Sequence, residues 1–432
     1  MADLARIRNE ELARILHQLA WSPERLAREV NLVLPPGLAI SQTAPYKWRD
    51  RGMVPRAPHD QAVCEVLSRA VGIAVTYEQL WGRMGSQRGA KVLSARLLTD
   101  PWTADTAQIA LREAGLQVAP VRLTDLFRGD ELARAALHWA APPPPVTGGT
   151  GALAVTEAQL ADLRRSCQGK RRLARACGGG LVLEPARAEL AMVGKLLELG
   201  DYAEQPELGR QLYAVAGRLA RLVGWAGADL GQEAAAQRAY VAALRAAHVA
   251  GEPSLGVSVV GSLAVQLAYH GAGRGLDPAE LLDTALAAAG SRLTPGQQAR
   301  QLGRLALAHG RNGDRAAAER AAEQAFAALP ADGDRAELAG LVGGAWLFLA
   351  EHERARPLLA EAVAGVTTAR ARALLLVRLA DSYRRTGDVE RATAMARRAR
   401  ELAAGMQSGL VARVLRELDG ALHAGAGPGR ER

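Results

Sequence analysis

A basic segment at residues 41–56 carries the side-chain types that bind nucleic acid. Four cations are offset only by Asp50, which gives the segment a local charge of +3 (four minus one). Guanidinium and ammonium groups bind phosphate oxygens, and short polar side chains hydrogen-bond to phosphates and base edges. We therefore predict that DNA is contacted by Ser41, Gln42, Thr43, Tyr46, Lys47, Arg49, Arg51 and Arg56. In this prediction Lys47, Arg49 and Arg51 hold phosphates, while Gln42, Thr43 and Tyr46 face base edges.

A second basic cluster, from Arg164 to Arg175, places six cations within twelve residues. One interpretation is that it extends the contact with phosphates, because each neutralised phosphate adds salt-dependent affinity. The other is a solvated helix face at the beginning of the C-terminal region. We favour the solvated face, because runs of charge are usually exposed to water.

No motif for catalysis or for a metal site is present. The eight histidines stand singly, and none forms H-E-x-x-H or pairs with a cysteine at metal-ligand spacing. The glycine runs at 178–180 and 271–275 lack the G-K-[ST] ending of a phosphate loop, and there is no G-x-S-x-G. We therefore expect no enzymatic activity, no cofactor and no bound metal.

Charge, cysteine content and the N-terminal residues indicate which kind of partner and which cellular compartment to expect. The net charge of +9, nearly all from arginine, favours an acidic partner without identifying it. Cys64, Cys167 and Cys177 form no C-x-x-C pair, so we expect reduced thiols in a cytoplasmic protein. The N-terminal residues MADLARIRNEEL carry charges where a signal peptide needs an apolar stretch. No run of about 18 apolar residues follows, so we expect no membrane span.

The elements that must position these residues are helices. Ala, Leu, Arg and Glu are abundant and aromatic residues make up only 4%, which predicts an all-α fold. In the N-terminal region the pattern predicts four short helices, with Trp48 as the core anchor of the third. Helices in this order are typical of a helix-turn-helix bundle whose third helix enters the major groove. The connection at 32–40 is longer than the usual turn of about three or four residues, so a bundle that no longer binds DNA is the alternative.

Helical repeats fill most of the C-terminal region. The segments 302–330 and 376–403 share Gly and Ala at matching positions, and further copies lie near Gly224, around 260–287 and near Gly343. Each unit reads as a helix, a short turn and a second helix, which resembles a slightly lengthened tetratricopeptide repeat (TPR) across roughly 208–403. Such units stack into a superhelix because one unit cannot bury its apolar face alone. The sequence therefore predicts a TPR-like α-solenoid.

The concave face of such a stack belongs to the first helix of each unit. The repeat register places on or near it Arg218, Arg221, Trp225, His270, Arg300, Asp381 and Arg384. A basic groove of this kind suits an acidic peptide or its C-terminal carboxylate. The alternative is that these residues only keep the stack in solution.

Two motifs resemble a group of actinobacterial regulators. They are S-x-x-x-x-Y-K-W-R-x-R-G-x-x-P-R at 41–56 and VLSRAVGIAVTYEQLWG at 66–82, and the segment 224–244 is similar to the first repeat of the same group. These regulators join an XRE-like helix-turn-helix to a C-terminal repeat domain. The resemblance implies a bacterial transcription regulator that binds double-stranded DNA, and a wider set of similar architecture senses peptides in the superhelical groove.

The expected organisation follows from these parts. We predict a helix-turn-helix domain at 1–85, a linker region with short helices and a Pro/Gly spacer at 86–152, a TPR-like domain at 153–424 and a disordered tail at 425–432. The TPR-like domain would mediate homodimerisation, effector sensing or both, since two half-sites double the contacts with DNA. The alternative is a protein–protein adaptor that acts through the TPR groove without touching DNA.

Overall fold

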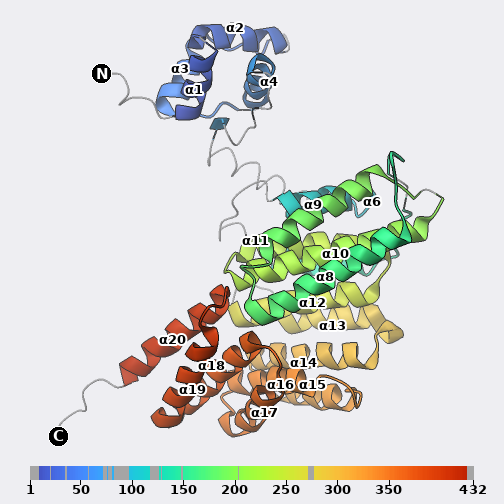
Figure 1. Ribbon diagram of the computed structural model, residues 1–432, viewed down its shortest axis with the longest axis vertical. Coiled ribbons are helices and arrows are strands. Elements are labelled where there is room, and N and C mark those ends of the chain that lie inside the picture. The colour runs from blue at the N-terminus through green and yellow to red at the C-terminus, as the bar shows by residue number, and fades with distance from the viewer. Residues whose placement is uncertain are drawn as a thin grey trace, which may run out of the picture. The chain divides into compact units, whose positions relative to one another are not determined.

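The computed structural model describes residues 9–19, 21–34, 37–56, 58–71, 75, 80–81, 97–116, 126–127, 129–146, 149–202, 204–270 and 277–425 (Figure 1). The chain divides into two compact units, Met1–Arg96 with Val118–Val121, and Leu97–Gln117 with Arg122–Arg432. Nearly all regular structure in the described part is helical, so the all-α prediction is confirmed. Within this part, no helix is both long enough and apolar enough to cross a membrane.

The first unit is a bundle of α1 (Glu10–Gln18), α2 (Pro23–Val33), α3 (Ala44–Arg51) and α4 (His59–Val71). The side chains of Asn9 and Ser22 cap α1 and α2 by accepting hydrogen bonds from backbone N–H groups of the first turn. Trp48, the predicted core anchor, is buried and packs edge-on against Trp81 with 5.8 Å between ring centroids. The apolar stripes of the helices therefore meet in one core, as predicted.

Asn31 closes the long connection between α2 and α3. Its side-chain amide donates to the Ile40 carbonyl at 3.0 Å, and its side-chain oxygen accepts from the Ile40 N–H at 2.8 Å. On α3, Tyr46 donates a hydrogen bond to the Glu24 carboxylate of α2. These contacts fix the two helices to each other despite the length of the link between them.

The second unit is a stack of paired helices (Figure 1). It contains α6 (Ala104–Leu116), α7 (Gly129–Trp139), α8 (Glu157–Cys177), α9 (Leu183–Leu199), α10 (Pro206–Asp229), α11 (Glu233–Ala250), α12 (Pro253–His270), α13 (Pro278–Ala289), α14 (Pro295–Asn312), α15 (Arg315–Ala327), α16 (Arg335–Phe348), α17 (His352–Gly365), α18 (Ala369–Arg385), α19 (Val389–Ala403) and α20 (Gly409–Gly425). Two short strands, β1 (Leu153–Ala154) and β2 (Gly200–Asp201), pair in parallel. The TPR-like α-solenoid is confirmed.

The Gly-Asp turns explain how each repeat reverses direction. Gly313 directly follows α14 with a φ of 79°, and Gly387 lies in the turn after α18 with a φ of 86°. Both values fall in the left-handed region, which favours glycine. The next residues, Asp314 and Asp388, cap α15 and α19 by accepting hydrogen bonds from backbone N–H groups. One glycine and one aspartate therefore end one helix and begin the next.

The region expected to be a linker divides differently. Leu97–Gln117 belongs to the second unit, and both α6 and α7 pack on α11. Arg245 on α11 is 1% exposed, and its guanidinium donates to the carbonyls of Leu97 and Asp100, both at 2.8 Å. A buried guanidinium must satisfy its donors, so these carbonyls hold the segment before α6 against the repeats. The predicted tail at 425–432 lies almost wholly outside the described residues.

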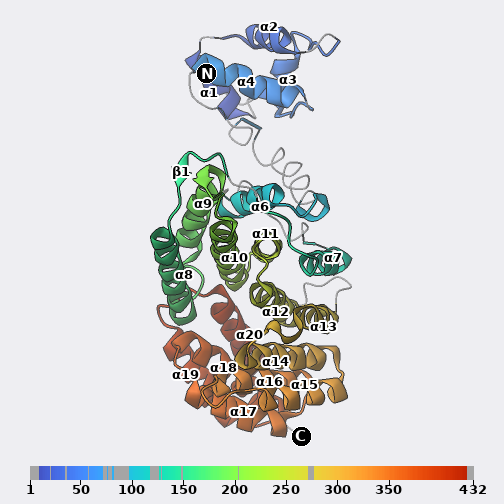
Figure 2. The ribbon, with the colours of Figure 1, turned by 90° about the vertical axis from the view of Figure 1, so that its right-hand side faces the viewer.

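The two ends of the stack contact each other. The Gly180 N–H donates to the Gln407 carbonyl at 2.8 Å, and the Gln407 N–H donates to the Cys177 carbonyl at 2.9 Å. Helix α8 also contacts α18, and Figure 2 shows the C-terminal helices returning to the side of α8. These contacts join the α8–α9 end of the stack to its C-terminal helices.

A buried carboxylate holds this contact together. Asp229 at the end of α10 is 3% exposed and accepts hydrogen bonds from the Gly179 N–H and the Ser408 hydroxyl, both at 2.8 Å. It also pairs with Arg370 of α18. We call these four residues, Gly179, Asp229, Arg370 and Ser408, the clasp, because they join the beginning and the end of the stack.

Candidate functional site

The predicted DNA-contacting residues lie just before α3, within it and shortly after its end. The exposed ones are Ser41, Gln42, Thr43, Lys47, Arg51 and Arg56. Thr43 precedes α3 without a side-chain cap hydrogen bond, and its hydroxyl lies 3.2 Å from that of Ser41. Six of the eight predicted side chains are therefore accessible to a ligand.

The other two predicted residues have partners inside the bundle. Arg49 pairs with Asp50 at 2.6 Å, and its guanidinium lies over the Tyr46 ring at 5.1 Å. Tyr46 donates to Glu24, and this hydrogen bond lowers the pKa of the Glu24 carboxyl. Tyr46 and Arg49 thus connect α3 to its surroundings, and a base or phosphate would have to compete with those contacts.

A groove of about 470 Å³ opens on the inner side of the repeat stack. Helices α8, α10, α12, α14, α16 and α18 all contribute to it, together with the turn before α18. Its charged and aromatic lining consists of Arg171, Arg175, Arg221, Trp225, Arg304, Asp334, Glu337, Arg370 and Arg378. We call this site the inner groove.

Most of the arginines in the inner groove have no carboxylate partner. Among described residues, no ion pair within 4 Å is formed by Arg171, Arg175, Arg221, Arg304 or Arg378. Arg221 donates only to the Ser262 hydroxyl at 3.3 Å, and its Nε is buried without a hydrogen-bond partner. Arg378 lies over the Tyr269 ring at 4.4 Å. Several positive charges therefore converge without compensation.

The acids of the inner groove are already engaged. Glu337 pairs with Arg300 at 3.0 Å, and Asp334 accepts a hydrogen bond from the Glu337 N–H at 2.8 Å as the cap of α16. Burial, followed by the charges of Arg171 and Arg304, lowers the pKa of Arg221 to about 9, which still leaves it charged at neutral pH. With six arginines and only two carboxylates in its lining, the groove carries an excess of positive charge.

Arg370 connects the inner groove to the clasp. Its guanidinium pairs with Asp229 on one side and lies over the Trp225 ring at 4.7 Å on the other. Both Arg370 and Trp225 line the groove. A ligand that contacts this pair would therefore touch the contact that closes the stack.

The groove residues predicted from the repeat register divide into two sets. Arg221 and Trp225 line the inner groove. Arg218 pairs with Glu252, and Arg300 pairs with Glu337, so neither offers a free charge. His270 ends α12, and its side chain lies outside the described residues.

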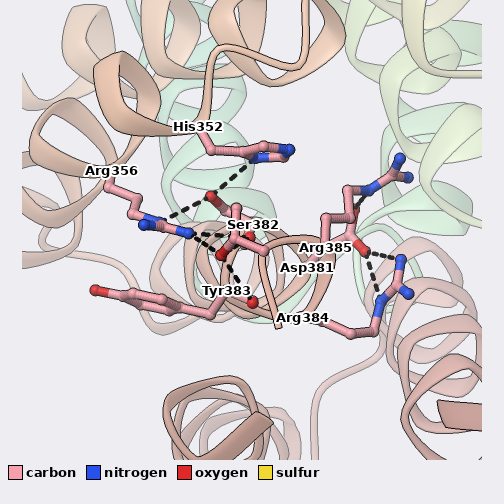
Figure 3. Close-up of polar contacts among 8 residues, drawn as sticks. His352, Arg356, Asp381, Ser382, Tyr383, Arg384 and Arg385 are labelled. Atoms are coloured by element: carbon pink, nitrogen blue, oxygen red, sulfur yellow. Dashed lines mark hydrogen bonds and ion pairs between the residues drawn. The ribbon is translucent and has the colours of Figure 1, made fainter. Parts of the chain in front are cut away.

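Asp381 and Arg384 do not line the inner groove. Figure 3 shows the Asp381 carboxylate between Arg384 and Arg385 of the same helix, with oxygen–nitrogen distances of 2.8 Å and 2.7 Å. On the adjoining side, Arg356 and His352 of α17 bind Ser382, with the His352 ring nitrogen 3.1 Å from the hydroxyl. His352 and Arg356 therefore join α17 to α18, and Asp381 gives Arg384 and Arg385 a shared carboxylate partner.

The sequence interpretation missed five lining arginines: Arg171, Arg175, Arg304, Arg370 and Arg378. Arg171 and Arg175 belong to the cluster that was interpreted as a solvated face. Arg304 and Arg378 hold the same repeat position, two residues before the equivalent Ala306 and Ala380. That shared position was the signal that could have found them.

The described residues include no group of three or more His, Cys, Asp or Glu side chains that could hold a metal ion. Their three cysteines are unpaired. Burial raises the pKa of the Cys167 thiol, which disfavours the reactive thiolate. The guanidinium groups that line the inner groove are of the kind that can bind anions.

A family model described as the SP15 N-terminal domain matches residues 12–81, which span the core of the first unit from Leu12 to Trp81. Among solved structures, the chain is similar to the crystal structure of the APC/C hetero-tetramer Cut9–Hcn1, with 13% identity, a TM-score of 0.34, and 93% of this chain and 73% of that chain covered. Among curated proteins, none matches the chain.

Proposed function

We propose that this chain is a binding protein whose inner groove holds an acidic segment of a partner protein. One observation carries the proposal: five arginines of the groove have no carboxylate partner within the described part of the chain. Repeat solenoids present extended concave surfaces on which binding sites are built. The chain would act as an adaptor or sensor, and we propose no enzymatic reaction and no cofactor for it.

Carboxylates of a partner would supply what the groove lacks. Arginine binds carboxylate in a bidentate geometry, and such charge-assisted hydrogen bonds are stronger than neutral ones. Trp225, Thr367 and Thr368 line the same groove and offer an apolar surface and hydroxyl groups to the rest of a peptide. An acidic segment, or a C-terminal carboxylate, matches this combination.

A labelled peptide of six glutamates tests this proposal. The full chain should bind it in a fluorescence anisotropy titration, with an affinity that falls as salt concentration rises. Arg304→Gln with Arg378→Gln should weaken binding by at least about tenfold, since both charges contact the ligand.

The matched control removes two arginines outside the groove. Arg165 and Arg397 have side chains that are 71% exposed, and they pair only with neighbours on their own helices. Arg165→Gln with Arg397→Gln therefore removes the same net charge and should leave peptide binding nearly unchanged. Equal losses in the two double variants would show that total charge, and not the groove, binds the peptide.

A second candidate function is DNA binding by the first unit. The observation that favours it is the exposed set of Ser41, Gln42, Thr43, Lys47 and Arg51 around α3. In this proposal the chain is a cytoplasmic transcription regulator of the XRE-like kind, working as a homodimer. The inner groove would then sense the effector.

Selection of random DNA duplexes by the full chain tests the second candidate. A shared short sequence should be enriched, and Lys47→Ala with Arg51→Ala should abolish the enrichment. The salt dependence of binding should flatten by about two units, because each lost phosphate contact releases about one counterion fewer. No enrichment above random sequence would remove this candidate and leave the adaptor proposal intact.

A further inference from the structure

Four arginines from three helices line the inner groove. Arg171 and Arg175 stand one turn apart on α8, Arg221 comes from α10, and Arg304 comes from α14. We call these four residues the arginine cluster. No carboxylate lies within ion-pair distance of any of them in the described part of the chain.

The cluster is held in place by the surrounding helices. Gly261 of α12 leaves room for Arg304: a Cβ at that position would lie 2.6 Å from the Arg304 Nη1 atom and 2.1 Å from Gln301 Oε1. Gln301, which is 2% exposed, accepts a hydrogen bond from Arg304 at 3.3 Å. Arg304 is therefore directed by packing and is not a freely moving surface side chain.

The four charges also act on one another. Burial lowers the pKa of Arg221, and the charges of Arg171 and Arg304 lower it further. Burial also lowers the pKa of Arg304; the Glu337 carboxylate opposes this effect, while the charges of Arg300 and Arg175 add to it. Arg175 is exposed, but Arg171, Arg221 and Arg304 are partly buried, and partial burial of like charges without a paired carboxylate costs free energy. An anion that binds all four guanidinium groups would recover that cost.

The charge density of the cluster favours phosphate over carboxylate. A carboxylate carries one negative charge, whereas a phosphoryl group carries about −1.5 to −2 at neutral pH and offers three acceptor oxygens. Four guanidinium groups from three helices can surround those oxygens, and arginine matches phosphate geometry with paired donors. We propose that the arginine cluster is a phosphoryl-binding subsite of the inner groove.

This inference rests on the proposed function, because it assumes that the inner groove is the binding site. It adds that part of the ligand is a phosphoryl group. Two sources supply the same chemistry: a phosphorylated side chain in the partner segment, or a free phosphate compound. The remainder of the groove, with Trp225 and Arg378, would hold the rest of a peptide. A free diphosphate would occupy the cluster alone.

Three labelled hexapeptides test the inference on the full chain. Five of the six positions are identical in all three peptides, and four of those five are glutamate. The sixth position is phosphoserine in one peptide, glutamate in the second and serine in the third. We expect the phosphoserine peptide to bind at least about tenfold more tightly than the glutamate peptide. Inorganic pyrophosphate is titrated separately by calorimetry and used as a competitor.

The outcomes separate the sources. A preference for the phosphoserine peptide supports the subsite and identifies a phosphorylated partner. Binding of pyrophosphate with equal affinities for the phosphoserine and glutamate peptides supports the subsite with a free phosphate compound as its ligand. Equal affinities together with no pyrophosphate binding overturn the inference, while peptide binding itself would keep the proposed function. Pyrophosphate binding without any peptide binding would keep the subsite and remove the proposed function.

Variants on α8 test whether the arginine cluster is the site that binds the phosphoryl group. Arg171→Gln with Arg175→Gln should remove the preference for phosphoserine and reduce pyrophosphate binding at least about tenfold. Arg165→Gln with Arg172→Gln alters two exposed arginines of the same helix that do not line the groove, and should change neither. Thermal melting of both double variants shows whether each is folded. Equal effects of the two pairs would overturn the assignment to the cluster.

Discussion

The two basic regions of this chain differ in what surrounds their charges. Around α3, Lys47 and Arg51 extend into solvent, and Arg49 pairs with its neighbour Asp50. In the inner groove, Arg221 and Arg304 are half-buried and have no carboxylate partner among the described residues. Exposed charges are screened by water and salt, whereas partly buried charges keep more of their interaction energy. Each arginine of the groove should therefore contribute more binding free energy to an anion than each cation around α3.

The strongest way to separate the two regions is to unfold one of them. Trp48→Ala removes a buried ring and its edge-on contact with Trp81, which should cost about 3–5 kcal/mol of the bundle's stability. A small bundle has only a few kcal/mol to lose. DNA selection by the full chain should then fail while hexaglutamate binding persists, as checked by duplex enrichment and anisotropy on one sample. Loss of both activities would show that the units depend on each other.

Within the groove, Arg370 is the arginine with a buried partner. Asp229→Ala leaves that guanidinium uncompensated and removes two further hydrogen bonds, so the repeat unit should lose about 3–5 kcal/mol in urea unfolding. Asp162→Ala, which breaks an exposed pair with Arg165, should cost at most about 1 kcal/mol. If the two variants were equally stable, the clasp would not hold the ends of the stack together.

The local parts of this fold followed from the sequence. Trp48 as the core anchor of the third helix and the short turn within each repeat unit depend on a few neighbouring residues. The matching positions of Ala306 and Ala380 predicted the stack, because helix pairs that pack closely need small residues there. Neighbouring residues of known chemistry thus predicted the elements and the repeat.

The closure of the stack and most of the groove did not follow from the sequence. Asp229 and Ser408 are 179 residues apart, and no repeat pattern links them. Because closure brings α8 beside α18, Arg171 faces the inner groove instead of open solvent. The register placed Arg300 on or near the concave side, but it could not show that Glu337 pairs with that charge.

Acid should weaken the repeat unit through a buried histidine. His248 is 5% exposed, and burial lowers its pKa below the ordinary 6.5. The unfolded chain therefore takes up a proton below pH 6.5 that the folded chain binds less readily, so stability is full above that pH and falls on acidification. The loss is at most about 1.4 kcal/mol per pH unit. His248→Gln should reduce the slope of stability against pH in urea titrations between pH 5 and pH 7, and an unchanged slope would contradict this assignment.

The smallest effect should come from an arginine that the repeat register placed in the groove. Arg384→Gln breaks a pair with Asp381 on the surface of α18, while Arg385 still binds the same carboxylate at 2.7 Å. We expect a loss of at most about 0.5 kcal/mol in stability and no change in hexaglutamate affinity. The anisotropy titration is run beside Arg378→Gln on the same helix, which should weaken binding severalfold. If Arg384→Gln weakened the peptide as much as Arg378→Gln, binding would depend on the net charge of α18, and the distinction between paired and unpaired arginines would fail.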